Sequence, residues 1–219
     1  AGFRLLVMDL PGHGLSSYPT GISLTVDDLA RALHEFVGTL RLKKIHLVGH
    51  SLGGAIALRY AAKFATNLVS FTNIEGNLVS EDCGILSREI RNRPFFGQEG
   101  DFFSAMTNIL HHIPLTGYKD FANNYLSRLN STQAWHDYCQ SLIELSDSGE
   151  LLKAFLELTV RRTYIHGDQN QPALLSTLEQ NGIEIIAIPG SSHWPMCSNP
   201  EEFYNQLATS LDSSKGLTQ

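Results

Sequence analysis

Short apolar runs alternate along the chain with longer segments in which apolar residues recur every three or four positions. The runs fall at residues 3–9, 44–49, 68–74, 162–166 and 184–188. Each run is continuous instead of alternating with polar residues, which is typical of strands covered on both faces. The sequence therefore predicts five buried strands.

Helix signals lie between these strands. Residues 26–40 carry one apolar stripe at helical spacing, and Thr25 with Asp28 forms a capping-box-like start. Further helices are expected at residues 52–64, at 172–180 and after Asn199, where proline occupies the first helical position. Strands that alternate with helices predict an α/β fold with a mostly parallel sheet between two helical layers.

The strand-like runs disappear between residues 82 and 157. Short amphipathic helical patterns alternate there with polar joints, so we interpret this segment as a helical insertion. The predicted organisation is a first core part at residues 1–81, the insertion at 82–157, and a second core part at 158–219.

Composition narrows the class of protein. The 219 residues are 42% hydrophobic and 17% charged, with a net charge of −6, which excludes a disordered chain and argues against a nucleic-acid surface. No apolar run reaches the roughly 18 residues of a membrane span. Three cysteines exclude a disulfide framework, and their spacing does not fit a zinc site. This small number of cysteines fits a reducing compartment, and we therefore predict a cytoplasmic protein.

The first motif with chemical meaning is Gly49-His-Ser-Leu-Gly53, a G-x-S-x-G sequence between a predicted strand and a predicted helix. A serine on such a sharp turn is held with its hydroxyl exposed above the sheet edge. The next amide, Leu52 N–H, begins the helix and can donate to a developing oxyanion. We therefore expect Ser51 to be a nucleophile and Leu52 N–H to form part of an oxyanion hole.

A histidine follows the last predicted strand, in Ser191-Ser-His-Trp-Pro195. A loop that leaves the carboxyl end of a neighbouring strand can reach the same crevice as the serine. His193 is therefore the candidate base that takes the Ser51 proton and returns it to the leaving group.

The carboxylate that would orient the imidazole has two candidate positions. Asp168 lies in the turn after residues 162–166, and Glu75 ends the strand at residues 68–74. A carboxylate so near an apolar strand end is costly unless it is paired, which favours a role for Glu75. Both candidates preserve the chain order serine, acid, histidine.

Three motifs together resemble the α/β-hydrolase fold superfamily. Asp9-Leu-Pro-Gly-His-Gly-Leu-Ser16 resembles the turn after the family's fourth strand, Gly49-His-Ser-Leu-Gly-Gly54 its nucleophile elbow, and Gly190-Ser-Ser-His-Trp-Pro195 its histidine loop. The resemblance implies Ser51 as nucleophile, Leu52 N–H in the oxyanion hole and His193 as base. It also implies that residues 82–157 form a helical cap over the site.

Two departures from the family pattern bear on the site. The usual acid position is occupied by Asn170, whereas some branches place the acid where Glu75 stands, so we favour Glu75 over Asp168. The family's first three strands and the loop with the second oxyanion amide precede the strand of Asp9. We therefore expect the chain to be the interior of a longer protein that completes the sheet and the oxyanion hole.

These features predict a serine hydrolase that cleaves a carboxylic ester or related acyl compound without a metal or organic cofactor. The predicted partner is a small acyl substrate, and the oligomeric state stays open. Aromatic candidates for the pocket wall are Phe95, Phe96, Phe102, Phe103, Tyr125 and Trp135. Two alternatives remain: carbon–carbon bond hydrolysis or lyase chemistry on the same residues, or a non-catalytic receptor for a small ligand.

Overall fold

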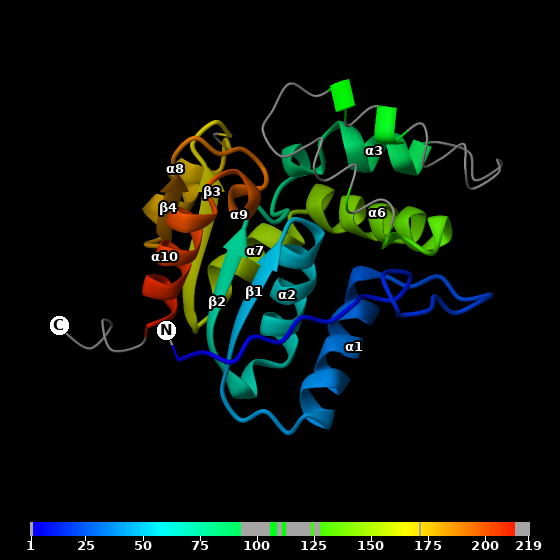
Figure 1. Cartoon of the computed structure of the whole chain (residues 1–219), viewed down its shortest axis with the longest axis horizontal. Helices are drawn as coiled ribbons and strands as arrows, with labels where there is room; N and C mark the ends of the chain where they lie inside the picture. Colours follow the sequence, from blue (N-terminus) through cyan, green and yellow to red (C-terminus); the bar gives the residue numbers. More distant parts are fainter. Residues whose placement is uncertain are drawn as a thin grey trace.

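The chain forms a four-stranded parallel sheet in a computed structural model that describes residues 2–92, 106–108, 111–112, 124, 128–170 and 172–212 (Figure 1). The strands lie side by side in the order of the sequence. They are β1 (Ile45–His50), β2 (Leu68–Ile74), β3 (Arg161–Gly167) and β4 (Glu184–Ile188). Four of the five predicted strands are therefore confirmed, and so is the parallel α/β architecture.

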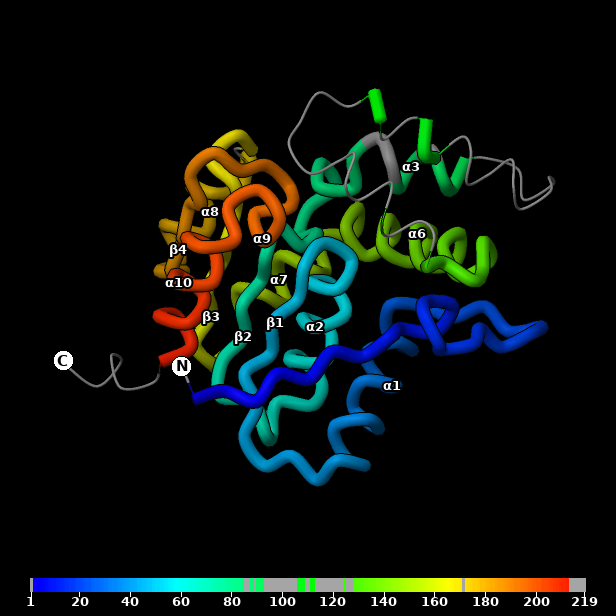
Figure 2. Tube along the Cα trace, in the orientation of Figure 1, coloured from blue at the N-terminus to red at the C-terminus, as the bar shows by residue number. Residues whose placement is uncertain are grey.

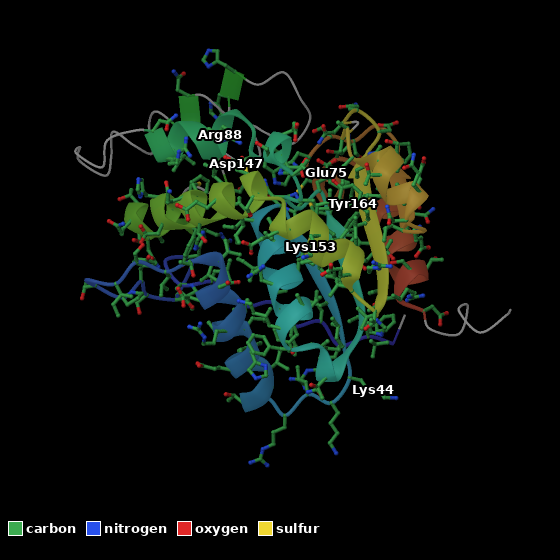
Figure 3. The ribbon with its side chains drawn as sticks, turned by 180° about the vertical axis from the view of Figure 1, so that it is seen from behind. Lys44, Glu75, Arg88, Asp147, Lys153 and Tyr164 are labelled. Atoms are coloured by element: carbon green, nitrogen blue, oxygen red, sulfur yellow. The ribbon has the colours of Figure 1, made fainter. Side chains whose placement is uncertain are left out.

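All carboxyl ends of the strands lie at one edge of the sheet, because every pairing is parallel. Ser51 follows β1 directly and Glu75 follows β2 directly. The loop after β4 reaches the same edge (Figure 1). Figure 3 shows Glu75 at this edge and Lys44, which precedes β1, at the opposite one.

Helices cover both faces of the sheet, as the sequence predicts. The helices outside the expected insertion are α1 (Val26–Thr39), α2 (Leu52–Lys63), α8 (Leu175–Gln180), α9 (Pro195–Ser198) and α10 (Pro200–Leu211), and a short 3₁₀ turn, η1 (Ala65–Asn67), precedes β2. Both hydrogen bonds of the Thr25–Asp28 capping box are present at the start of α1: each side chain accepts from the backbone amide of the other residue. None of the helices in the described ranges is long and apolar enough to cross a bilayer.

The core lies on the two faces of the sheet. On the face of α2, Phe71 of β2 meets Phe155 edge to face, with ring centroids 5.7 Å apart. On the other face a smaller cluster packs under α10, formed by Ile74, Ile165, Ile188 and Phe203. Alternate residues of one strand thus serve two different cores, which explains why the runs read as continuously apolar.

The predicted strand at residues 3–9 is wrong for this structure. These residues are extended but form no strand, and Figure 2 shows them as the blue tube that crosses in front of β1. Leu5 and Val7 are 83% and 82% exposed, while the Phe3 ring touches His46. An apolar run becomes a strand only where a neighbouring strand pairs its backbone groups, and the described sheet places none beside this one.

The 3₁₀ turn η2 (Ser80–Cys83) lies across the start of the expected insertion, which contains helices α3 (Ile85–Asn92), α6 (Thr132–Asp147) and α7 (Glu150–Glu157). Helix α6 packs against α3, and Arg88 binds Asp147 across them with a 2.7 Å ion pair (Figure 3). Helix α7 packs against α2. The boundaries of a cap at residues 82–157 stay a prediction.

Candidate active site

Ser51 occupies a strained turn between β1 and α2. Its backbone angles are φ 53° and ψ −125°, and its amide donates to the Ile74 carbonyl at 3.1 Å. A left-handed φ is rare for residues other than glycine, asparagine and aspartate. The turn also requires Gly49, because a Cβ there would overlap the Gly53 carbonyl. The bend that the G-x-S-x-G motif predicts is therefore present, and it lifts Ser51 out of the line of β1.

The Leu52 amide begins α2 at the same bend. Among the described residues no carbonyl or side chain accepts its N–H. The first amides of a helix have no partner within the helix and lie at its positive end. Leu52 N–H is therefore free to donate to an oxygen beside Ser51.

Glu75 and His193 are in contact at the carboxyl edge of the sheet. His193 Nδ1 lies 3.0 Å from Glu75 Oε2, and the Glu75 side chain is only 2% exposed. The backbone of Glu75 is also left-handed, with φ 45°. Gly167 N–H donates to the other carboxylate oxygen at 2.8 Å. The carboxylate is thus fixed at one end by a backbone amide and faces the imidazole at the other.

The alternative acid, Asp168, lies elsewhere. It is exposed, and its carboxylate accepts a hydrogen bond from the Ser191 amide at 3.2 Å. This contact holds the loop that carries His193 without touching the imidazole. Asn170, at the usual acid position of the family, donates to Glu75 Oε2. The geometry therefore brings Glu75, and not Asp168, to the ring of His193.

His50 is a neighbour of the site that sequence reasoning missed. Its Nε2 donates to the His193 carbonyl at 2.7 Å, and the two rings lie 4.8 Å apart. Desolvation by the surrounding protein, together with nearby His193, lowers the pKa of His50 to about 3, so the ring is neutral at ordinary pH. The contact joins the residue before Ser51 to the histidine loop. Its position inside the G-x-S-x-G motif was the available signal.

The turn after residues 3–9 is bonded to the segment that leads into α6. Asp9 accepts the Leu15 amide at 3.1 Å, while Gly12 and Gly14 exchange backbone hydrogen bonds with Asn130 and Arg128. These two backbone contacts fix the turn against the residues that precede α6.

His13, in the middle of this turn, is buried and carries a lowered pKa because of that burial. Trp135 Nε1 donates to His13 Nε2 at 3.3 Å. Trp135 is therefore packed on the turn, and its expected role in a pocket wall stays a prediction. The other five aromatic candidates for the wall lie outside the described residues: Phe95, Phe96, Phe102, Phe103 and Tyr125.

Across the ranges that the structure describes, no group of three or more histidine, cysteine, aspartate or glutamate side chains could hold a metal ion. A cavity of about 730 Å³ lies between residues 15–23 and residues 130–133. None of the predicted site residues is among those that line it.

Two curated relatives give context. A probable serine hydrolase of Drosophila melanogaster is 41% identical over 77 residues, which are 34% of this chain and 23% of the relative. A putative carbamate hydrolase RutD of Pantoea ananatis is 34% identical over 183 residues, which are 69% of this chain and 66% of the relative. The matched part of the chain thus spans less than a quarter of the first relative and about two thirds of the second.

A solved structure shares the fold. A carboxylesterase structure from the ammonia-oxidising thaumarchaeon Nitrososphaera gargenis superposes with a TM-score of 0.72 and 19% identity, covering 93% of this chain and 77% of that one. The sequence profile of the alpha/beta hydrolase family matches residues 1–206. The matched residues contain a parallel sheet, with a serine on a strained bend after β1 and a histidine loop after β4. The chain therefore belongs to the alpha/beta hydrolase family.

Proposed function

We propose that the protein is a serine hydrolase that cleaves a carboxylic ester or a related acyl compound. Ser51 attacks the acyl carbon, His193 takes the hydroxyl proton, and Glu75 holds the imidazole and stabilises its positive charge. The Leu52 amide donates to the oxyanion of the tetrahedral intermediate. The intermediate collapses when the bond to the leaving group breaks and His193 gives its proton to that group, which leaves Ser51 acylated. His193 then takes a proton from water, which attacks the acyl-enzyme, and its return to Ser51 releases the acid.

The observation that carries this proposal is the contact between His193 and Glu75. A buried carboxylate at 3.0 Å from Nδ1 selects the tautomer with the proton on Nδ1, in which Nε2 is the basic nitrogen of the ring. The same carboxylate stabilises the imidazolium that forms once the proton has moved. A histidine held in this way is prepared to act as a general base, in contrast to one that only packs in a loop.

The names of the relatives support the same class of reaction. One is a probable serine hydrolase, and a structure with the same fold is a carboxylesterase. We propose further that α3 and α6, which lie within the predicted limits of residues 82–157, belong to a cap that selects the acyl group. The partner is then a small acyl substrate.

A fluorophosphonate probe tests the nucleophile. The intact protein should be labelled at one serine, and Ser51→Ala should abolish the labelling. Ser148→Ala is the matched control, because this exposed hydroxyl bonds only to its own turn: it donates to the Leu145 carbonyl and accepts from the Glu150 amide. Its labelling should equal that of the unchanged protein.

Two other outcomes would contradict the proposal. A folded protein that is not labelled at all would favour a non-catalytic receptor for a small ligand. Labelling of Ser51 without turnover of p-nitrophenyl esters of any chain length, but with cleavage of a β-diketone, would favour carbon–carbon bond hydrolysis.

A further inference from the structure

The Glu75 carboxylate receives three hydrogen bonds, from the last residue of β3, from the turn after β3 and from the loop after β4. Gly167 N–H donates to Oε1, whereas His193 Nδ1 and the Asn170 side-chain amide both donate to Oε2. Asn170 and His193 therefore share one oxygen atom. The amide stands on the side of the carboxylate away from the Gly167 contact.

A buried carboxylate depends on such donors because water cannot solvate it. Only 2% of the Glu75 side chain is exposed. Each donor to the ionised form stabilises that form, and removal of one leaves the charge short of a partner. Without Asn170, Oε2 would be held only by His193, the group that must change its protonation state during catalysis.

Asn170 is itself held in place by its own backbone. The backbone N–H of Asn170 donates to the Gly167 carbonyl at 3.0 Å, and the backbone carbonyl of Asn170 accepts from His166 Nδ1 at 2.9 Å. The residue is thus bonded on both sides of its α-carbon within one tight turn. A side chain that starts from a fixed backbone loses less entropy on forming its hydrogen bond, so the donor is preorganised.

The charge of the side chain matters as much as its shape. A carboxylate at this position would face Glu75 at hydrogen-bond distance, and two carboxylates so close cannot both ionise at neutral pH. The amide of Asn170 supplies a donor and adds no charge. Glu75 can therefore remain the single anion beside the imidazole.

We propose that Asn170 is a positioning residue, which acts on His193 through the carboxylate of Glu75. This inference rests on the proposed hydrolase function. It assigns a task to the residue that stands at the family's usual acid position but cannot act as the acid itself.

Two variants test the proposal: Asn170→Ala removes the donor, and Asn170→Asp replaces it by a second acid of nearly the same shape. The control is Asn181→Ala, because that side chain donates only to the Thr177 carbonyl at the end of α8. For each protein, kcat and KM for p-nitrophenyl acetate are measured between pH 5 and pH 9. The rate of fluorophosphonate labelling is measured in parallel.

We expect Asn170→Ala to lower kcat by about tenfold with KM within about twofold, since one hydrogen bond to a charged group is lost. The acidic limb of the kcat profile should move to higher pH, because the carboxylate loses a donor that favours its charged form. In Asn170→Asp the shift should be larger, about one pH unit, since like charges raise the apparent pKa of the pair. Asn181→Ala should keep the profile of the unchanged protein.

The outcomes separate this proposal from the function on which it depends. An unchanged protein that neither labels nor turns over ester overturns the hydrolase function. If the unchanged protein is active, but both Asn170 variants keep its kcat and its acidic limb, the positioning role is overturned and the hydrolase function stands. A loss of stability alone would lower the active fraction without moving the acidic limb, and that result also overturns the role.

Discussion

Glutamine at position 75 would remove one negative charge and nearly preserve the shape of the side chain. With 3.0 Å between His193 Nδ1 and Glu75 Oε2 and an effective dielectric constant of about 20, the attraction between carboxylate and imidazolium is about 5.5 kcal/mol. The glutamine dipole retains part of this attraction, so we expect the barrier to rise by about 3–5 kcal/mol. That rise corresponds to a loss of about 10²–10⁴ in kcat.

The hydrogen bonds predict how glutamine would lie. Its oxygen should take the place of Oε2, where His193 and Asn170 both donate, and its NH₂ group would then face Gly167 N–H. Two donors that face each other cost about 1–3 kcal/mol in the free energy of unfolding. Chemical denaturation should therefore show a stability loss of this size in the Glu75→Gln protein.

The assay compares kcat for p-nitrophenyl acetate at pH 8 in Glu75→Gln and in Asp168→Asn. The second variant makes the same change, from carboxylate to amide, at an exposed side chain that contacts only the histidine loop. It should lower kcat by less than about threefold. A larger loss in Asp168→Asn than in Glu75→Gln would refute the assignment of Glu75 and move the acid to position 168.

Three further predictions concern the bend, the histidine loop and the acid stability. Gly49→Ala should destabilise the protein by about 1–3 kcal/mol or more in urea denaturation, because the added carbon overlaps a backbone carbonyl, and an unchanged midpoint would contradict this. His50→Ala should lower kcat by about 2–10-fold, because the hydrogen bond from His50 to the His193 carbonyl is lost. The loss should be equal at pH 6 and pH 9, since His50 is neutral at both, and a loss that depends on pH would show that the charge of His50 matters. The hydrogen-bonded ion pair with Arg59 holds the pKa of Asp27 at about 2, below its usual 3.8. The contribution of this pair to the free energy of unfolding is therefore present above pH 4 and is lost as the pH falls toward 2. Melting temperatures of Asp27→Asn and the unchanged protein should converge over that interval, and a constant difference would exclude the linkage.

Local patterns predicted most of the sheet and the helix starts. The strand at residues 68–74 agrees with β2, and the one at 184–188 agrees with β4. The Thr25 cap is also present, because its signal lies within four consecutive residues. The prediction of a strand at residues 3–9 was wrong for the opposite reason. Strand formation there depends on a partner that no local pattern describes.

The sequence favours Glu75 over Asp168 as the acid, but the residues alone do not decide between them. Both follow strands whose carboxyl ends lie at the same edge, and the strand order places β3, which precedes Asp168, between β2 and β4. Which carboxylate reaches His193 depends on the path of two loops. The contacts made by Asn170 and His50 were missed for the same reason, since they join segments 95 and 143 residues apart.

The described residues contain three non-glycine residues with a left-handed backbone, and two of them are Ser51 and Glu75. Each such conformation costs of order 1–3 kcal/mol, a cost that glycine escapes and asparagine lowers. Selection for heat resistance alone would therefore favour replacing the two side chains that the proposed reaction needs. In this protein, robustness and turnover make opposing demands on the same two positions, and any effort to stabilise it should leave both unaltered.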